Sequence, residues 1–165
     1  MVFDISRFSN LGHYKNIILS RFIQDENLVK AIYYNSDDFV SQGTLSNPAS
    51  LINTQIFPYP FVPEINDEAK TYISMSFGDF KLTYNTSFVA GLIAISVITH
   101  KNLVLLDPSY GMLRYDYIIN RIDTLLDETN SIGAGKLEFA DLGDFRIPDT
   151  NWVGATIVYR PVDFR

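Results

Sequence analysis

The apolar run FVAGLIAISVI, from Phe88 to Ile98, restricts the possible folds more than any other part of the chain. It is 11 residues long, whereas a helix that crosses a membrane needs about 20. Its β-branched residues favour a strand, and a strand that is apolar on both sides is buried on both. We therefore expect a central strand and no contact with a membrane. In a chain of 165 residues, part of the cover for this strand is expected from another subunit.

The clearest helical pattern lies between Met112 and Asp127. Apolar residues recur at helical spacing along one side of this segment, at Tyr115, Ile118, Ile119, Ile122, Leu125 and Leu126. Polar residues such as Asp116 and Asn120 cover the other side. The pattern predicts a helix that lies along a sheet with its apolar stripe inward.

Two helices are also expected at the start of the chain. Ser9 or Asn10 is predicted to cap a helix that begins near Leu11, and Asp25 to cap a second, shorter one. The apolar faces of the two helices are Leu11, Tyr14, Ile18, Phe22 and Ile23 in the first, and Leu28, Val29 and Ile32 in the second.

Strand patterns fill most of the remaining chain. TYISMSF alternates between apolar and polar residues, and a turn is expected at Gly78 and Asp79. KLEFADLGDFRI and WVGATIVYRPVDF, separated by the turn PDTN, are predicted to close the chain as two strands. The order α-α-β-β-α-β-β indicates an α+β fold, a mostly antiparallel β-sheet packed by helices. We expect residues 1–165 to form a single domain.

Residues 36–63 form a long polar loop that ends in a proline and aromatic arm, IFPYPFVP. Prolines at 58, 60 and 63 exclude a helix and a central strand, so the arm is expected to be extended. Phe57, Tyr59 and Phe61 have two possible roles. They close the core of their own chain, or they dock into a neighbouring chain as a subunit interface, because aromatic residues are enriched in both settings.

The segment SIGAGKLEF, from Ser131 to Phe139, superficially resembles a phosphate-binding loop. A P-loop runs from a strand into a helix and has the form GxxxxGK[ST]. Here the glycines follow a predicted helix, and Lys136 precedes Leu137 instead of Ser or Thr. The segment is therefore predicted to be a helix C-cap and a turn into the next strand, with no affinity for nucleotides.

The chain offers no constellation that argues for catalysis, a metal or a cofactor. Cysteine is absent, and the two histidines, His13 and His100, lack partners at metal-ligand spacing. The adjacent acids at Ser36–Asp38 and at Asp127 and Glu128 are typical of solvated loops and helix ends. A net charge of -6 argues against binding nucleic acid over a broad surface. We expect no enzyme, no catalytic, cofactor-binding or metal-binding residue, and no cofactor.

Four pieces of the chain, in order, resemble one family of viral proteins. They are YKNIILSRFIQDENLVKAIYYN, then IFPYPFVPEINDEAKTYISMSF, then GLIAISVITH with GMLRYDYIINRIDTLLD, and finally SIGAGKLEF with WVGATIVYRPVDF. Together they cover most of the sequence and resemble the tail-terminator, or tail-completion, proteins in the neck of long-tailed bacteriophages.

This resemblance implies a virion protein that is made in the host cytoplasm and has no catalytic role. Six copies would form a homohexameric ring that ends the tail tube and joins it to the head-completion or connector protein. DNA would pass through the ring without sequence-specific binding, which suits an acidic chain. Two alternatives stay open: another head-tail adaptor or stopper protein of the same assembly, and a small-molecule-binding α+β domain.

Overall fold

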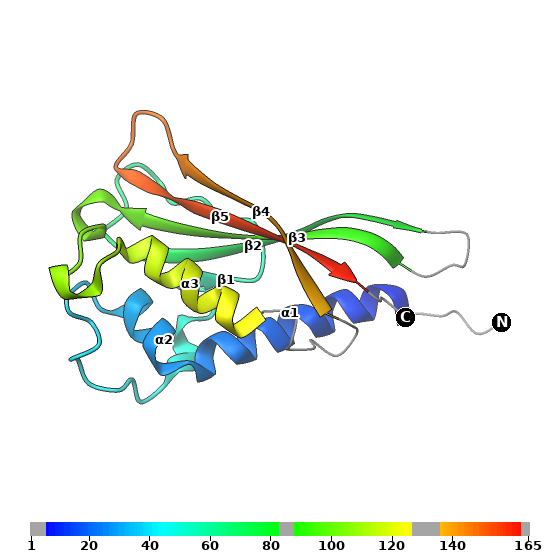
Figure 1. The fold of residues 1–165 in the computed structure, drawn as a ribbon, viewed down its shortest axis with the longest axis horizontal. Coiled ribbons are helices and arrows are strands. Elements are labelled where there is room, and N and C mark those ends of the chain that lie inside the picture. The colour runs from blue at the N-terminus through cyan, green and yellow to red at the C-terminus, as the bar shows by residue number, and fades with distance from the viewer. Residues whose placement is uncertain (1–5, 83–87, 127–135, 163–165) are drawn as a thin grey trace.

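Three helices cover one face of a five-stranded sheet (Figure 1). The computed structural model describes residues 6–82, 88–126 and 136–162. The helices are α1 (Ser6–Gln24), α2 (Glu26–Tyr33) and α3 (Arg114–Leu126). Short 3-10 turns occur at Pro48–Leu51, Lys101–Leu103 and Pro108–Tyr110. None of the helices in the described ranges is long and apolar enough to cross a bilayer.

The sheet has the strand order β1-β2-β3-β5-β4, and only β1 runs parallel to its neighbour. Its members are β1 (Ile56–Phe57), β2 (Thr71–Leu82), β3 (Phe88–His100), β4 (Lys136–Arg146) and β5 (Trp152–Val162). The predicted α+β class with a mostly antiparallel sheet is confirmed. The central position predicted for the apolar run is also confirmed, because β3 lies between β2 and β5.

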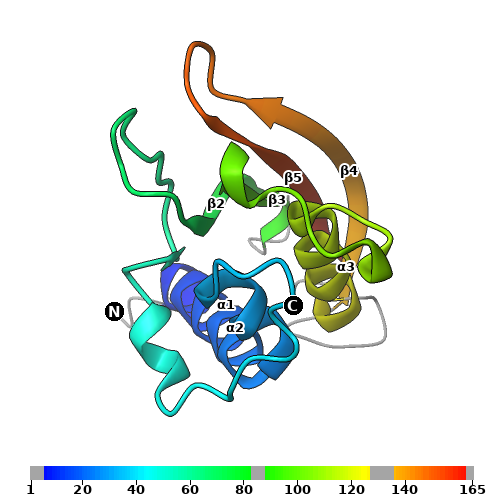
Figure 2. The same cartoon turned by 90° about the vertical axis from the view of Figure 1, so that its left-hand side faces the viewer.

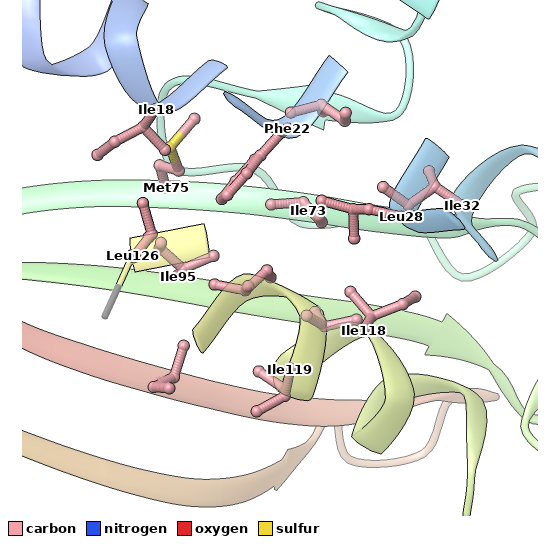
Figure 3. Packing of buried hydrophobic residues seen from close by; sticks show 14 of the residues in the cluster. Ile18, Phe22, Leu28, Ile32, Ile73, Met75, Ile95, Ile118, Ile119 and Leu126 are labelled. Carbon is pink, nitrogen blue, oxygen red and sulfur yellow. The ribbon is translucent and has the colours of Figure 1, made fainter. Parts of the chain in front are cut away.

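The main core lies between the helices and the inner face of the sheet (Figure 3). Ile18 and Phe22 of α1 and Ile118 of α3 meet Ile73 and Ile95 of the sheet, and all five side chains have no exposed surface. The apolar stripes predicted for the three helices are the surfaces that pack here. Because strands β2, β3 and β5 all contribute to one cluster, the helices hold the middle of the sheet together.

Two predicted boundaries are wrong. Helix α1 begins at Ser6, so Ser9 and Asn10 lie inside the helix instead of capping it. The chain does not turn at Gly78 and Asp79, because β2 continues to Leu82 with irregular register after Gly78. A glycine within paired strands is accommodated by a local irregularity in register. The pairing of β2 with β3 therefore continues past Gly78, although the sequence there is also compatible with a turn. The cap predicted at Asp25 is confirmed, since its carboxylate accepts a hydrogen bond from the Leu28 amide at 2.8 Å.

A second, smaller cluster covers one end of the outer face of the sheet. It consists of Phe57, Tyr72, Ile98 and Trp152, all at most 6% exposed. Further along the outer face, Ser96 of β3 and Thr156 of β5 hydrogen bond across the strands at 2.8 Å. Part of the cover that the sequence led us to expect from another subunit is therefore supplied within the chain.

Arg114, the first residue of α3, is fully buried and ties α3 to the segment that follows α2. Its guanidinium donates four hydrogen bonds to backbone carbonyls, those of Leu103, Ala31, Tyr34 and Ser36, at 2.6–2.9 Å. Burial lowers the pKa of Arg114 to about 10, so the side chain is still charged at neutral pH. This arginine fixes where α3 begins and how it lies over the sheet.

Candidate functional site

The proline and aromatic arm folds back on its own sheet. Phe57 ends β1, and its ring stacks on that of Phe61 with the centroids 3.8 Å apart and the planes 10° apart. Tyr72 lies against both rings, and Trp152 lies against Tyr72. Phe57 and Phe61 thus close a core of their own chain, the first of the two roles considered for them.

Three hydrogen bonds fix the arm and Glu64, the residue after it, to the outer face of the sheet. Ser74 Oγ accepts from the Phe61 amide at 2.8 Å and donates to the Tyr59 carbonyl at 3.2 Å. Trp152 Nε1 donates to the Glu64 carbonyl at 3.1 Å. Because its backbone is already held in place, the arm would lose little conformational freedom on meeting a partner.

The outer part of the arm and the residues just after it expose apolar surface. Tyr59 is 46% exposed, and Val62 and Ile65 are each 65% exposed. Of the three residues predicted to form a subunit interface, Phe57 is buried, Phe61 is half-buried and Tyr59 is open to solvent. The interface itself stays a prediction, and Tyr59 is the member of the set with the most surface to contribute to it.

A second surface, which the sequence did not predict, is a groove between α3 and β4. It has a volume of about 300 Å³. Its lining is Asp116, Ile119, Asn120, Asp123, Phe139, Leu142, Asp144, Ala155 and Ile157. Figure 2 shows β4 extending past α3 at this end of the sheet. Phe139 is 55% exposed and Leu142 is 51% exposed, so the inner face of β4 is left largely uncovered.

The groove is acidic. Asp116 and Asp123 lie on its α3 side, Asp144 lies on its β4 side, and no lysine or arginine lines it. Asp123 accepts a hydrogen bond from the Tyr159 hydroxyl at 2.7 Å, which fixes its position. The pKa of the nearby Tyr115 phenol is raised by burial and further by the negative charges of Asp116 and Asp144. The surface therefore combines exposed apolar side chains with a negative potential.

An irregular register in β4 explains why sequence periodicity missed this groove. Phe139 and Leu142 are three residues apart, so simple alternation places them on opposite faces of a strand. In the sheet, Phe139 pairs with Tyr159 and Leu142 with Ile157, and both therefore face the helices. The register shift between Phe139 and Asp141 takes up one extra residue, Ala140. The alternation of apolar and polar residues carries no mark of such a shift.

The two histidines and the acids Asp37 and Asp38 do not line the groove, and the ring of His100 packs edge-on against Trp152 with the centroids 5.1 Å apart. His13 is exposed on α1, and His100 accepts a hydrogen bond from the Asn102 amide through Nδ1 at 3.2 Å. Asp38 accepts from the Tyr110 hydroxyl at 2.8 Å, which lowers the pKa of its carboxyl. Across the described part of the chain, no three His, Asp or Glu side chains are grouped to hold a metal.

The predicted cap and turn at Ser131–Gly135 and the acids at Asp127 and Glu128 lie outside the described residues. Lys136 is the first residue of β4, so the lysine that suggested a phosphate loop belongs to a strand. The expectation that nucleotides do not bind stays a prediction.

Comparison with known families places the chain in a viral context. A family model named YomW matches residues 25–161, which is most of the chain. The chain belongs to the YomW family. This family is phage-derived, of the Bacillus prophage type, and the chain is therefore a phage-related protein. No curated protein and no solved structure matches it.

The YomW match includes both surfaces described above. It begins at Asp25, the cap of α2, and extends to Pro161 in β5, so that it spans the proline and aromatic arm and the groove beside β4. Helix α1 precedes it.

Proposed function

We propose that this phage-related chain is a structural protein of the virion neck. Six copies form a ring that terminates the tail tube and joins it to the head-completion or connector protein, and DNA passes through the ring. The resemblance to tail-terminator proteins suggested this role, and membership of a phage-derived family supports its viral setting.

The observation that carries the proposal is the amount of apolar surface left open on a small phage chain. Tyr59 and Val62 on the arm, and Ile65 two residues after it, lie on one side of the sheet, and Phe139 and Leu142 lie beside the groove on the other. Exposed apolar groups gathered in this way are typical of protein interfaces. Two different surfaces on one chain also suit heterologous contacts, which close into rings when the rotation between subunits allows it.

Negative charge is consistent with a channel for DNA. With 19 acidic and 13 basic residues, the chain has a net charge of -6. Tight binding to phosphates requires clustered lysine and arginine, and an acidic ring would let DNA slide without being held.

The test is cryo-electron microscopy of intact particles that contain this protein. We expect six copies in a ring between the tail tube and the head connector. A ring at an adjacent level of the neck would favour the alternative of a head-completion or stopper protein. A single copy, a position away from the neck, or absence from the virion would overturn the proposal.

The alternative from another class is a small-molecule-binding domain. The groove supports this alternative, although its volume of about 300 Å³ lies at the lower end of the range for ligand pockets, about 300–1,000 Å³. Its exposed Phe139 and Leu142 make it an open surface instead of an enclosed pocket. Specific binding of a metabolite, with the protein missing from virions, would favour this alternative.

A further inference from the structure

The free edge of β4 and the groove beside it form one continuous surface. β4 pairs with β5 and with no other strand in the described part of the chain. At 11 residues it is long for an edge strand. The outer edge of such a strand presents backbone N–H and C=O groups to which another extended chain can be added.

The inner side of this edge favours apolar side chains. Phe139 and Leu142 are about half exposed, and the groove floor beside them is formed by Ile119, Ala155 and Ile157, which are buried. An incoming strand would place every second side chain on this side. Apolar side chains there would cover the surface that α3 leaves open.

The outer side of the same edge favours basic side chains. Glu138 pairs with Arg160 and Asp141 with Val158, so both acids lie on the face opposite the helices, and both are exposed. Arg160 offsets part of the charge of Glu138, whereas Asp141 lies opposite an uncharged residue. The carboxylates of the groove, including Asp144, add to the negative potential on the inner side.

Charge complementarity argues against a second copy of the chain as the occupant. The chain has a net charge of -6, and two β4 edges brought together would set like charges against each other. The exposed arm of a second copy is also a poor match for the β4 edge, because the acidic residues Glu64, Asp67 and Glu68 follow its apolar residues. A basic partner avoids both conflicts.

We propose that β4 binds an extended segment of another protein in which basic and apolar residues alternate. The segment adds as a sixth strand to the sheet, which has five strands. Its apolar side chains contact Phe139 and Leu142, and its basic side chains lie near Glu138 and Asp141. This assignment concerns a binding surface and holds whether or not the chain is part of a phage neck.

The probe is a capped ten-residue peptide of alternating lysine and valine, with an alternating glutamate and valine peptide for comparison. Fluorescence anisotropy measures the affinity, and amide NMR spectra of isotope-labelled protein locate the site. We expect the lysine peptide to bind, with shifts concentrated on β4 and the groove, and the glutamate peptide not to bind.

Matched variants separate the proposed contacts from general electrostatic attraction. The double variant Glu138→Gln and Asp141→Asn should weaken binding at least about tenfold, because both acids face the basic side chains. The control, Glu68→Gln with Asp149→Asn, removes the same number of negative charges at exposed sites outside β4 and its groove, one before β2 and one in the turn after β4, and should change affinity less than about twofold. Asp149 has a φ of 57°, which asparagine tolerates.

Leu142→Ser tests the apolar contact, and Leu105→Ser is its control, because Leu105 is 74% exposed and lies outside the α3–β4 groove. Circular dichroism spectra matching the original chain would show that each variant is folded. Binding should fall at least about tenfold for Leu142→Ser, and less than about twofold for its control.

N-methylated peptides test the pairing of strands. Methyl groups on one set of alternate amides block the hydrogen bonds to β4, and those on the other set point away from it. One methylated peptide should therefore lose binding and the other should keep it. The proposal is overturned if the lysine peptide does not bind, if neither methylation matters, or if the shifts lie on other elements. Self-association that Leu142→Ser abolishes would also overturn it, since the occupant would then be a second copy.

Discussion

Replacing Arg114 with lysine tests whether one buried guanidinium holds the position of α3. Arg114 has no exposed surface and donates to four carbonyls, two from its Nη1 atom. These carbonyls belong to α2, to the segment after it and to the 3-10 turn Lys101–Leu103 that follows β3. Lysine keeps the positive charge but has a single nitrogen, which cannot occupy the positions of three guanidinium nitrogens.

The expected loss of stability follows from the hydrogen bonds. A bond to a charged group contributes about 1.5–3 kcal/mol, and a buried carbonyl left without a donor costs about 1–3 kcal/mol. If lysine retains two of the four bonds, the free energy of unfolding falls by about 3–6 kcal/mol. This is a large share of the total of about 5–15 kcal/mol typical of a domain.

Urea unfolding followed by tryptophan fluorescence measures this loss, because Trp152 is the only tryptophan and is fully buried in β5. With a slope of about 2 kcal/mol per molar urea, a loss of about 4 kcal/mol lowers the midpoint by about 2 M. Arg160→Lys is the control, since Arg160 is exposed, and it should change stability by less than about 0.5 kcal/mol. Equal midpoints for the two variants would refute the role assigned to Arg114.

Three further predictions concern the core, the sheet and acid stability. Ile122→Asp should give no soluble folded protein, because Ile122 is fully buried and an unpaired carboxylate there costs several kcal/mol; a soluble variant with unchanged melting would contradict the packing of α3. Gly154→Ala would place a Cβ 1.7 Å from the Val97 carbonyl oxygen, so β3 and β5 must shift, and the free energy of unfolding should fall by about 1–3 kcal/mol. The melting temperature measured by calorimetry should therefore fall, and an unchanged value would contradict this close contact between the strands. The hydrogen bond from Tyr110 lowers the pKa of Asp38 in the folded chain, so its stabilising effect is present above the ordinary aspartate pKa and is lost below about pH 4. Unfolding of Asp38→Asn should therefore depend less on pH in that acidic range, and identical pH profiles would contradict this account.

Sequence periodicity predicted the elements whose signal comes from burial. In α3 the apolar stripe from Ile118 to Leu126 is the face that packs on the sheet, and in β3 the apolar run marks a strand with neighbours on both edges. Both elements were therefore placed correctly. Boundaries were less predictable. Gly78 is compatible with a turn and with a strand, and only the pairing of β2 with β3 decides between them. The short strand β1 likewise depends on its contact with β2.

The candidate surfaces were predictable only in part. The aromatic residues of the arm were recognisable from composition, but their division into buried Phe57 and exposed Tyr59 depends on the position of Ser74 and Trp152, which are distant in sequence. The groove could not be predicted, because it needs α3 to leave the inner face of β4 uncovered. How far a helix extends over a sheet is a property of tertiary packing, and local periodicity carries no information on it.

The extra residue at Ala140 links the fold of β4 to its surface. A shift of one residue moves every following side chain to the other face of a strand. Without the shift, Asp141 would lie opposite Ile157 on the inner face, and Leu142 would turn outward, away from the groove. The inner face would then place a carboxylate against a buried apolar strand, and the outer face would expose a leucine opposite Thr156. With the shift, Leu142 completes the apolar part of the groove, and the carboxylate of Asp141 lies on the solvent side instead of against Ile157.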